Sequence, residues 1–429
     1  LAAVEDAPDM RPHSNAMVED RSPGGALEVW NEVVTEAKHN FHWTMGVCAG
    51  FSGVVLDLIG GAPCGVNLSG DSSTGKTIAL LLGTTIWTTA VPDHGLFHVM
   101  NSTSNALEDL FTQGSATFTA LDEIGAMQNP AALASILFGA SSGSGKKRKA
   151  GRGVGLAETA EFRTFTMLTN EHGLKDTITG AGGTYKTGLS VRFPDIDVTG
   201  SKKVDQEVLD KLDKVKENFG HAGPAFIRYL IAEGWHNKPE ALKKKIKDAA
   251  GEIAGNGAAP ALRRAAEVFA LMQVSGELAA DAGLIDKDPI KPAIKKAFAA
   301  FKVSDEGRAT TGGDNLLDGF RSWVVRSIGQ TLINASDAAD TRYRDVRGWV
   351  TDDMIILDYS LMADMKAMGL SGKRDTLLDA ADTAKVLIKS GKNRTHNKLP
   401  KEVELDGGAA LRGEFLADVQ GAVFVGVVF

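Results

Sequence analysis

The sequence has 429 residues, more than one ordinary hydrophobic core organises, so we expect two or three domains. With 43% hydrophobic and 24% charged residues, its composition is ordinary for a soluble globular protein. A formal net charge of −7 excludes a global cationic field for nucleic acid, so any contact with a polyanion must come from local basic patches.

Cys48 and Cys64 are the only cysteines in the chain, and they lack metal-ligand spacing. We expect both to be small buried hydrophobes in a reducing cytoplasm, with a disulfide between them as the alternative. The polar, acidic start LAAVEDAPDM is unlike a secretory signal. Residues 44–60 are apolar but carry glycines and Asp57, which favours a buried helix over a membrane span.

The apolar spacing predicts an α/β region followed by a helical one. Residues 1–25 are expected to be loosely ordered, and helices are expected over 26–40 and 44–60. Strands separated by helices over 60–200 indicate a three-layer α/β sheet. The elements expected there are a strand before Gly70 with a helix after it, strands at 117–123 and 162–170, a helix at 130–140 and a loop with a short strand in 188–198. From 201 to 303 the pattern is helical, and DEGRATTGGDN (305–315) is the predicted linker to a mixed C-terminal part.

The stretch LSGDSSTGKTIAL contains the full phosphate-loop pattern G-x-x-x-x-G-K-[ST] between a predicted strand and a predicted helix. Glycines at both ends let the backbone turn so that successive N–H groups face phosphate oxygens. A lysine supplies charge for the β and γ phosphates, and a threonine hydroxyl suits Mg²⁺. The predicted ATP-binding residues are Gly70, Asp71, Ser72, Ser73, Thr74, Gly75, Lys76 and Thr77.

A second nucleotide element is the acidic pair Asp122 and Glu123, which ends the predicted strand TFTALDE 45 residues after Thr77. Asp122 is predicted to hold Mg²⁺ together with Thr77, and Glu123 to orient and deprotonate the attacking water. Because this chemistry uses water, the pair favours a hydrolase over a phosphate-loop kinase.

These residues carry a resemblance. LSGDSSTGKTIAL, NSTSNALEDL and ALDEIG resemble the AAA+ ATPase domain of phage and plasmid primase-helicases, a family long catalogued as a domain of unknown function. Further matches are SSGSGKKRKAGRG, FTMLTNE and RRAAEVFALMQVSGELAADAGL, so that the resemblance covers about residues 26–300. The family is similar to minichromosome-maintenance and superfamily 3 helicases, which act as hexameric rings on DNA.

The resemblance implies roles for two further residues in the core. Asn170 would be the sensor that helps to position the water, with Thr169 as its rival and a helix-capping Asn as the alternative. Arg192, in LSVRFPDID, would be the arginine finger that reaches a neighbour's ATP, although Val191 and Pro194 depart from the family pattern. An ion pair with an aspartate of its own subunit is the other reading of Arg192.

Arg263 and Arg264 match the position of a second sensor in the helical lid. Adjacent helical residues point in different directions, so only one of them can fill this role, and we favour Arg264. A solvated helix face is the alternative. The resemblance also places a pore hairpin between Asp122 and Asn170. The predicted DNA-binding residues of this basic loop are Lys146, Lys147, Arg148, Lys149 and Arg152. A solvated surface run is the alternative.

We therefore expect an AAA+ core with a helical lid and a winged-helix-like C-terminal domain, whose DNA contacts would be Lys373, Arg374, Lys392 and Arg394. The predicted domains are an N-terminal helical segment (1–62), the ATP-binding core (63–200), the lid (201–304) and the C-terminal α+β domain (316–429). The expected function is that of a ring-forming, ATP-hydrolysing DNA helicase of a mobile element. It would act on single-stranded or forked DNA, with a primase or polymerase as a further partner and no membrane contact. The alternative is an AAA+ loader or remodeller that acts on a protein partner.

Overall fold

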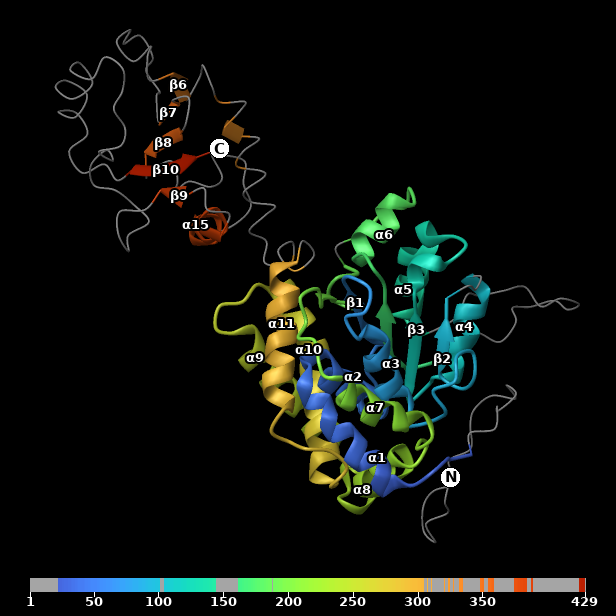
Figure 1. The fold of residues 1–429 in the computed structure, drawn as a ribbon. Helices are drawn as coiled ribbons and strands as arrows, with labels where there is room; N and C mark the ends of the chain where they lie inside the picture. Colours follow the sequence, from blue (N-terminus) through green and yellow to red (C-terminus); the bar gives the residue numbers. More distant parts are fainter. Residues whose placement is uncertain are drawn as a thin grey trace, which may run out of the picture. The chain divides into compact units, whose positions relative to one another are not determined.

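The computed structural model describes residues 22–100, 104–143, 161–186 and 188–304, scattered positions from 307 to 327, and short segments between 332 and 428. The chain divides into two compact units, Leu1–Thr310 and Thr311–Phe429. The division lies within the glycine-rich residues 305–315. Each unit contains a five-stranded sheet (Figure 1).

The sheet of the first unit is entirely parallel, in the order β2-β3-β4-β1-β5. Its strands are β1 (Cys64–Ser69), β2 (Phe97–Val99), β3 (Phe118–Asp122), β4 (Phe165–Thr169) and β5 (Asp195–Asp197). Because the strands are parallel, their carboxyl ends meet at one edge of the sheet, which we call the carboxyl edge, and their starts form the amino edge. The turn after β1, Asp122 and the residue after β4 are therefore brought to the same edge.

Side chains alternate along these strands between two cores, so helices cover both faces of the sheet. On β4, Met167 lies in one core cluster and Leu168 in the other, and β3 divides in the same way. The first core includes α2 (Phe41–Leu58) and α3 (Lys76–Thr84), and the second includes α4 (Ser104–Gln113), α5 (Leu133–Ala140) and α6 (Leu174–Gly180). The expected α/β fold is confirmed, with a five-stranded parallel sheet.

The central helix α2 is long and apolar enough to cross a membrane by composition, with a mean hydropathy of 1.2, but 78% of it is buried inside this fold. It is a core helix, as the sequence predicts. Its glycines allow very close packing: an added Cβ at Gly53 would lie 1.4 Å from the Thr117 carbonyl oxygen, and one at Gly46 would lie 2.3 Å from the Ala79 carbonyl oxygen. Only glycine permits α2 to approach the neighbouring backbone this closely.

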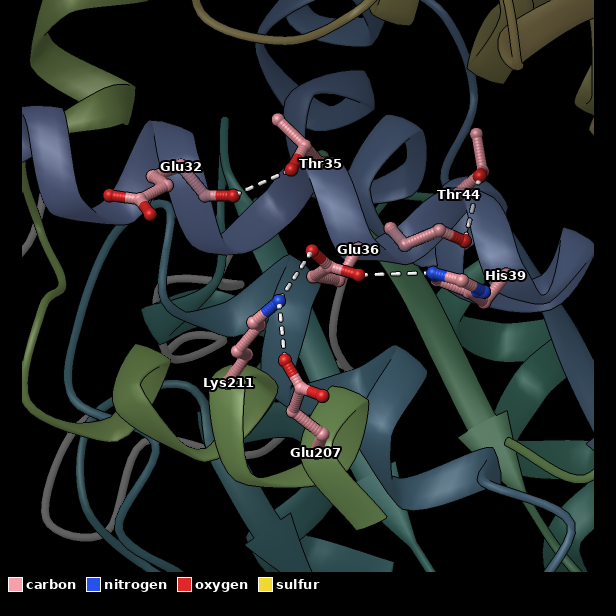
Figure 2. Close-up of polar contacts among 8 residues, drawn as sticks. Glu32, Thr35, Glu36, His39, Thr44, Glu207 and Lys211 are labelled. Carbon is pink, nitrogen blue, oxygen red and sulfur yellow. Dashed lines mark hydrogen bonds and ion pairs between the residues drawn. The ribbon is translucent and has the colours of Figure 1, made fainter. Parts of the chain in front are cut away.

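The N-terminal helical segment is attached to the core by both apolar and polar contacts. Trp30 of α1 (Leu27–Val34) is fully buried, and its indole N–H donates to Thr85. After α1, the 3-10 turn η1 (Thr35–His39) meets α7 (Gln206–Asp213), as Figure 2 shows. There the Glu36 carboxylate lies 3.0 Å from His39 Nε2 and 3.9 Å from Lys211 Nζ. These groups are partly exposed, so the contribution of the pair to stability is at most about 1 kcal/mol.

Residues 201–303 are mostly helical, as their sequence pattern predicts. Beyond α7 it contains α8 (Ala222–Ala232), α9 (Pro239–Ala254), α10 (Pro260–Asp281) and α11 (Ile290–Val303). Shorter 3-10 turns are η2 (Ile124–Ala126), η3 (Pro130–Ala132), η4 (Lys214–Lys216) and η5 (Trp235–Asn237). Helix α10 packs against α2, α9 and α11, and most of its length is buried. Pro260 suits its first turn, because a first-turn residue needs no N–H partner.

The second unit has the strand order β6-β7-β8-β10-β9, in which only β6 and β7 pair in parallel. Its described elements are β6 (Leu332–Asn334), β7 (Gly348–Val350), β8 (Met354–Asp358), α15 (Arg374–Thr383), β9 (Leu387–Ile388) and β10 (Phe424–Val428). The apolar C-terminal stretch forms β10, between β8 and β9. The predicted winged-helix contacts Lys373, Lys392 and Arg394 lie outside the described residues, as does the side chain of Arg374.

Most of the predicted elements of the core are present. The helix predicted at 130–140 is the 3-10 turn η3 followed by α5. Cys48 and Cys64 are both free, and burial raises the pKa of each thiol to about 12, so the disulfide alternative is wrong. Strand β2 is missing from the prediction, because its three residues are too few to show an alternating pattern.

Candidate functional site

The phosphate loop joins β1 to α3 at the carboxyl edge. Its backbone has positive φ at Gly70 (133°), Ser73 (63°) and Gly75 (82°). Glycine is needed at the first and last of these positions, because an added Cβ would lie 2.7 Å from Thr199 Oγ1 at Gly70 and 2.7 Å from Trp43 Nε1 at Gly75. The N-terminus of α3 follows directly, so its unpaired N–H groups and positive helix end face the same space.

Lys76 is half-buried and lies folded over this loop. Its ammonium Nζ donates to the Gly70 carbonyl at 2.6 Å and to the Asp71 carbonyl at 2.8 Å. Burial lowers the Lys76 pKa, against which the nearby Glu171 and Asp122 carboxylates act. The two carbonyls satisfy the ammonium within the loop, where phosphate oxygens could take their place.

Two side chains at the start of α2 form hydrogen bonds with backbone carbonyls of the phosphate loop. The indole N–H of Trp43 donates to the Gly75 carbonyl at 3.0 Å, and His42 Nε2 lies 3.0 Å from the Thr74 carbonyl. This contact puts the proton of the neutral ring on Nε2. His42 is fully buried, which lowers its pKa to about 4. The loop therefore rests on a neutral imidazole and an indole that sequence reasoning did not find.

Asp122 connects the phosphate loop to β4. Its Oδ2 accepts a hydrogen bond from the Thr77 hydroxyl at 3.1 Å, and its Oδ1 accepts one from the Thr169 hydroxyl. The structure thus brings together two residues 45 positions apart in the sequence, Thr77 and Asp122, which are the pair predicted to hold a metal.

Glu123 is exposed at the same edge, directly after β3. Its backbone lies in the left-handed region, with φ of 53°, and its N–H donates to Thr169 Oγ1 at 3.1 Å. A non-glycine residue in this conformation is uncommon, and strained backbone positions of this kind cluster at functional sites. At this position the strand ends and the 3-10 turn η2 begins, and Glu123 is exposed whereas Asp122 is buried.

Asn170 follows β4 and is buried beside the turn after Glu123. Its Oδ1 accepts a hydrogen bond from the Gly125 N–H at 3.2 Å, and its amide Nδ2 donates to Thr177 Oγ1. Thr169, the rival sensor, is the residue that contacts Asp122 and the Glu123 backbone. Thr169 thus contacts the acidic pair itself, whereas Asn170 contacts the turn that follows the pair.

The donor chemistry fits Mg²⁺ and a nucleoside triphosphate. Hydroxyl and carboxylate oxygens are the ligands that Mg²⁺ prefers, and this ion uses few protein ligands because water and phosphate oxygens supply the rest. The described residues hold no cluster of three or more His, Cys, Asp or Glu side chains that would form a complete cage. Thr77 and Asp122 would therefore hold the ion, and the glycine loop with Lys76 would hold the phosphates.

Arg192 lies at the opposite edge of the sheet. Its carbonyl accepts the N–H of Gly65, near the start of β1, whereas the phosphate loop follows the end of this strand. The intervening five residues of strand span about 16 Å, more than an arginine side chain reaches. The guanidinium donates to the Gly188 carbonyl at 2.8 Å and lies 5.4 Å from the Phe138 ring centre. No carboxylate of the described chain forms an ion pair with it.

The structure does not bring Arg264 to the phosphate loop of its own subunit. Both Arg263 and Arg264 are exposed on α10. The basic loop residues Lys146, Lys147, Arg148, Lys149 and Arg152 lie outside the described residues.

Comparisons with known proteins agree with this fold. A family model described as a domain of unknown function, DUF927, matches residues 4–155, which is less than half of the chain. No curated protein matches the sequence. A solved structure described as the active helicase Cch of the type IV SCCmec element is similar, with a TM-score of 0.58 and 18% sequence identity. The likeness covers 91% of this chain and 72% of that one. It shows that the two chains share a fold over most of the length of this one.

Proposed function

We propose that this protein is an ATPase that hydrolyses ATP with Mg²⁺ and uses the energy to move along DNA as a ring-forming helicase. The observation that carries the ATPase part is the contact of Thr77 with Asp122, 3.1 Å apart, beside a glycine loop capped by Lys76. Such an arrangement combines phosphate binding, a metal position and an adjacent carboxylate at a single sheet edge.

Each residue has one task in this proposal. Lys76 and the loop N–H groups bind the phosphates, and Thr77 with Asp122 holds Mg²⁺, which neutralises charge on the phosphate oxygens when bound. Glu123 accepts the proton of the attacking water. Thr169 fixes the Asp122 carboxylate, and Asn170 acts as the sensor beside Glu123 through the Gly125 turn.

Hydrolysis would need a second subunit. Arg192 is separated from its own phosphate loop by the length of β1. Its guanidinium forms no ion pair with a described carboxylate, so it keeps its positive charge at the amino edge. We propose that it reaches the ATP of a neighbour in a hexameric ring, as an arginine finger. Arg264, which is exposed on α10, would act as a second sensor toward a neighbour's nucleotide. Turnover per subunit should then rise with protein concentration.

The DNA part of the proposal rests on the basic loop and on the fold of the similar helicase. Six copies of the loop would line a positive channel for single-stranded or forked DNA. Residues 201–304 would form the lid of the ATP site, and residues 316–429 a winged-helix-like domain. We place the protein in the cytoplasm, in the replication system of a phage, plasmid or other mobile element, with a primase or polymerase as a further partner.

ATP turnover with Mg²⁺ tests the active site. Lys76→Ala should abolish ATP binding, whereas Glu123→Gln should keep binding and lower turnover by about 10²- to 10⁴-fold, the usual contribution of a general base. Lys247→Ala, at an exposed position of α9, is the matched control and should behave as the parent does. Parental turnover by Lys76→Ala would refute the proposed site.

The same assay with and without single-stranded DNA separates a DNA motor from a protein remodeller. The test variant replaces Lys146, Lys147, Arg148 and Lys149 with glutamine. The charge-matched control replaces the exposed α9 residues Lys243, Lys244, Lys245 and Lys247 in the same way. A DNA motor predicts that DNA stimulates the parent and the control, and that only the loop variant loses the stimulation. If DNA stimulates none of them, the remodeller is the better function.

A further inference from the structure

The side chain of Arg192 is held in place by an aromatic ring from another element. Phe138, on α5, lies beneath two cations: the Arg192 guanidinium at 5.4 Å from the ring centre and the Lys186 ammonium at 5.9 Å. Both distances lie within the range of cation–π attraction. Arg192 also donates to the Gly188 carbonyl at 2.8 Å, so two contacts fix its direction.

The backbone between the two cations is fitted to this ring. An added Cβ at Gly188 would lie 3.1 Å from the Phe138 ring and 3.5 Å from Arg192 Nη1. Phe138 is only partly buried, as is Arg192, and Lys186 is exposed. Because no described carboxylate pairs with Arg192, the ring and the carbonyl orient the guanidinium without neutralising it.

Helix α5, which carries Phe138, comes directly before the basic loop that contains Lys146 to Arg152. Helix α5 ends at Ala140, only two residues after Phe138, and the chain enters the segment after Gly143. It returns at Phe162, whose N–H donates to the Gly143 carbonyl at 3.0 Å, so the two ends of the segment are joined. An added Cβ at Gly143 would lie 3.5 Å from Pro63, while Gly65, two residues on, bonds the Arg192 carbonyl. Gly143, the last described residue before the basic loop, and the backbone of Arg192 therefore both lie near the start of β1.

We infer that Phe138 is a positioning residue that holds Arg192 and Lys186 as a pair of cations for a neighbouring subunit's ATP. The inference rests on the proposed function, since it assumes that Arg192 acts on a neighbour. Lys186 is then a second cation that acts in trans.

Substitutions at Phe138 test the inference through ATP turnover at protein concentrations where the oligomer forms. Phe138→Leu keeps an apolar side chain but removes the ring, and should lower kcat about three- to ten-fold, as expected for a cation–π contact of this exposure. The KM for ATP should not change, because the phosphate loop is intact. Phe138→Tyr should restore kcat, and Ser135→Ala, at an exposed position of the same helix, should leave it unchanged.

Mixed oligomers decide whether the effect acts in trans. Glu123→Gln subunits cannot hydrolyse ATP but carry an intact Arg192. Adding them in excess should restore turnover by Phe138→Leu subunits and by Arg192→Ala subunits alike. If Arg192→Ala is rescued and Phe138→Leu is not, Phe138 acts within its own subunit and the inference is wrong. If Arg192→Ala alone turns over ATP as the parent does, the proposed arginine finger fails instead.

Discussion

The phosphate loop depends on single residues that come from a distant part of the chain. The carbonyls of Thr74 and Gly75 are bonded by His42 and Trp43, more than 30 residues earlier. The ring of His42 is neutral in the folded protein, because burial, together with the charges of Lys296 and Lys76, lowers its pKa to about 4. An ordinary histidine in the unfolded chain titrates near 6.5.

This difference predicts a loss of stability in mild acid. Below pH 6.5 the unfolded chain binds a proton at His42 that the folded protein does not, so the free energy of unfolding falls as the pH falls toward 4. Between pH 8 and pH 5 this single group should account for about 2 kcal/mol. Urea unfolding at several pH values measures it. His42→Gln should have a flatter pH dependence than the parent, whereas His94→Gln, at an exposed histidine, should match the parent. Equal slopes for His42→Gln and the parent would contradict the buried neutral ring.

At the scale of elements, the fold depends on how closely α2 approaches its neighbours. Gly53 faces the backbone of Thr117, just before β3, and Gly46 faces the backbone of Ala79 on α3. These contacts place α2 so that His42, at its first turn, lies under the phosphate loop. A helix held 1 Å further out would remove this support from the loop.

Replacement of glycine by alanine should therefore have opposite effects on stability at two helical positions, one on α2 and one on α9. Gly53→Ala forces a Cβ into the Thr117 carbonyl and should lower the free energy of unfolding by about 3 kcal/mol. Gly251→Ala, on α9, meets open space and should raise it by about 0.5 to 1 kcal/mol, since alanine loses less entropy in a helix. Denaturant unfolding of both variants is the measurement. Parental stability of Gly53→Ala would show that α2 does not pack this closely.

At the scale of the whole molecule, the first unit has a core that continues from the N-terminal helices to α11. Trp30, Phe51 and Phe301 belong to one buried cluster, together with the sheet and the helices of residues 206–303. All described members of this cluster precede Thr310, the last residue of the first unit.

We therefore expect a chain that ends at Thr310 to fold and to bind ATP. A chain that ends at Asp281 is the matched comparison: it lacks α11, whose Phe298 and Phe301 pack against Phe269, and it should not fold. Calorimetry with and without ATP checks both. If the shorter chain folds and binds ATP, α11 is not an integral part of this core.

The residues of the candidate site were predictable from the sequence where their chemistry is local. The phosphate loop is one contiguous turn whose glycines occupy backbone conformations that other residues avoid, and Asp122 with Glu123 ends a strand of clear alternation. By contrast, Arg264 showed only a match of position, and in the structure it is exposed on α10, so its sensor role stays a prediction. The contacts of Phe138 with Arg192 and of Trp43 with Gly75 have no sequence pattern.

By itself, the sequence determined the α/β class, the phosphate loop, the acidic pair and the order of the elements, because these follow from short-range periodicity and from the steric demands of glycine. Only the tertiary structure decided which distant side chains surround the loop, that Thr77 meets Asp122, and that Arg192 lies at the edge opposite its own phosphate loop. The physical reason is that these contacts depend on strand order and on helix approach, which are set by packing between segments and are not encoded in any one of them.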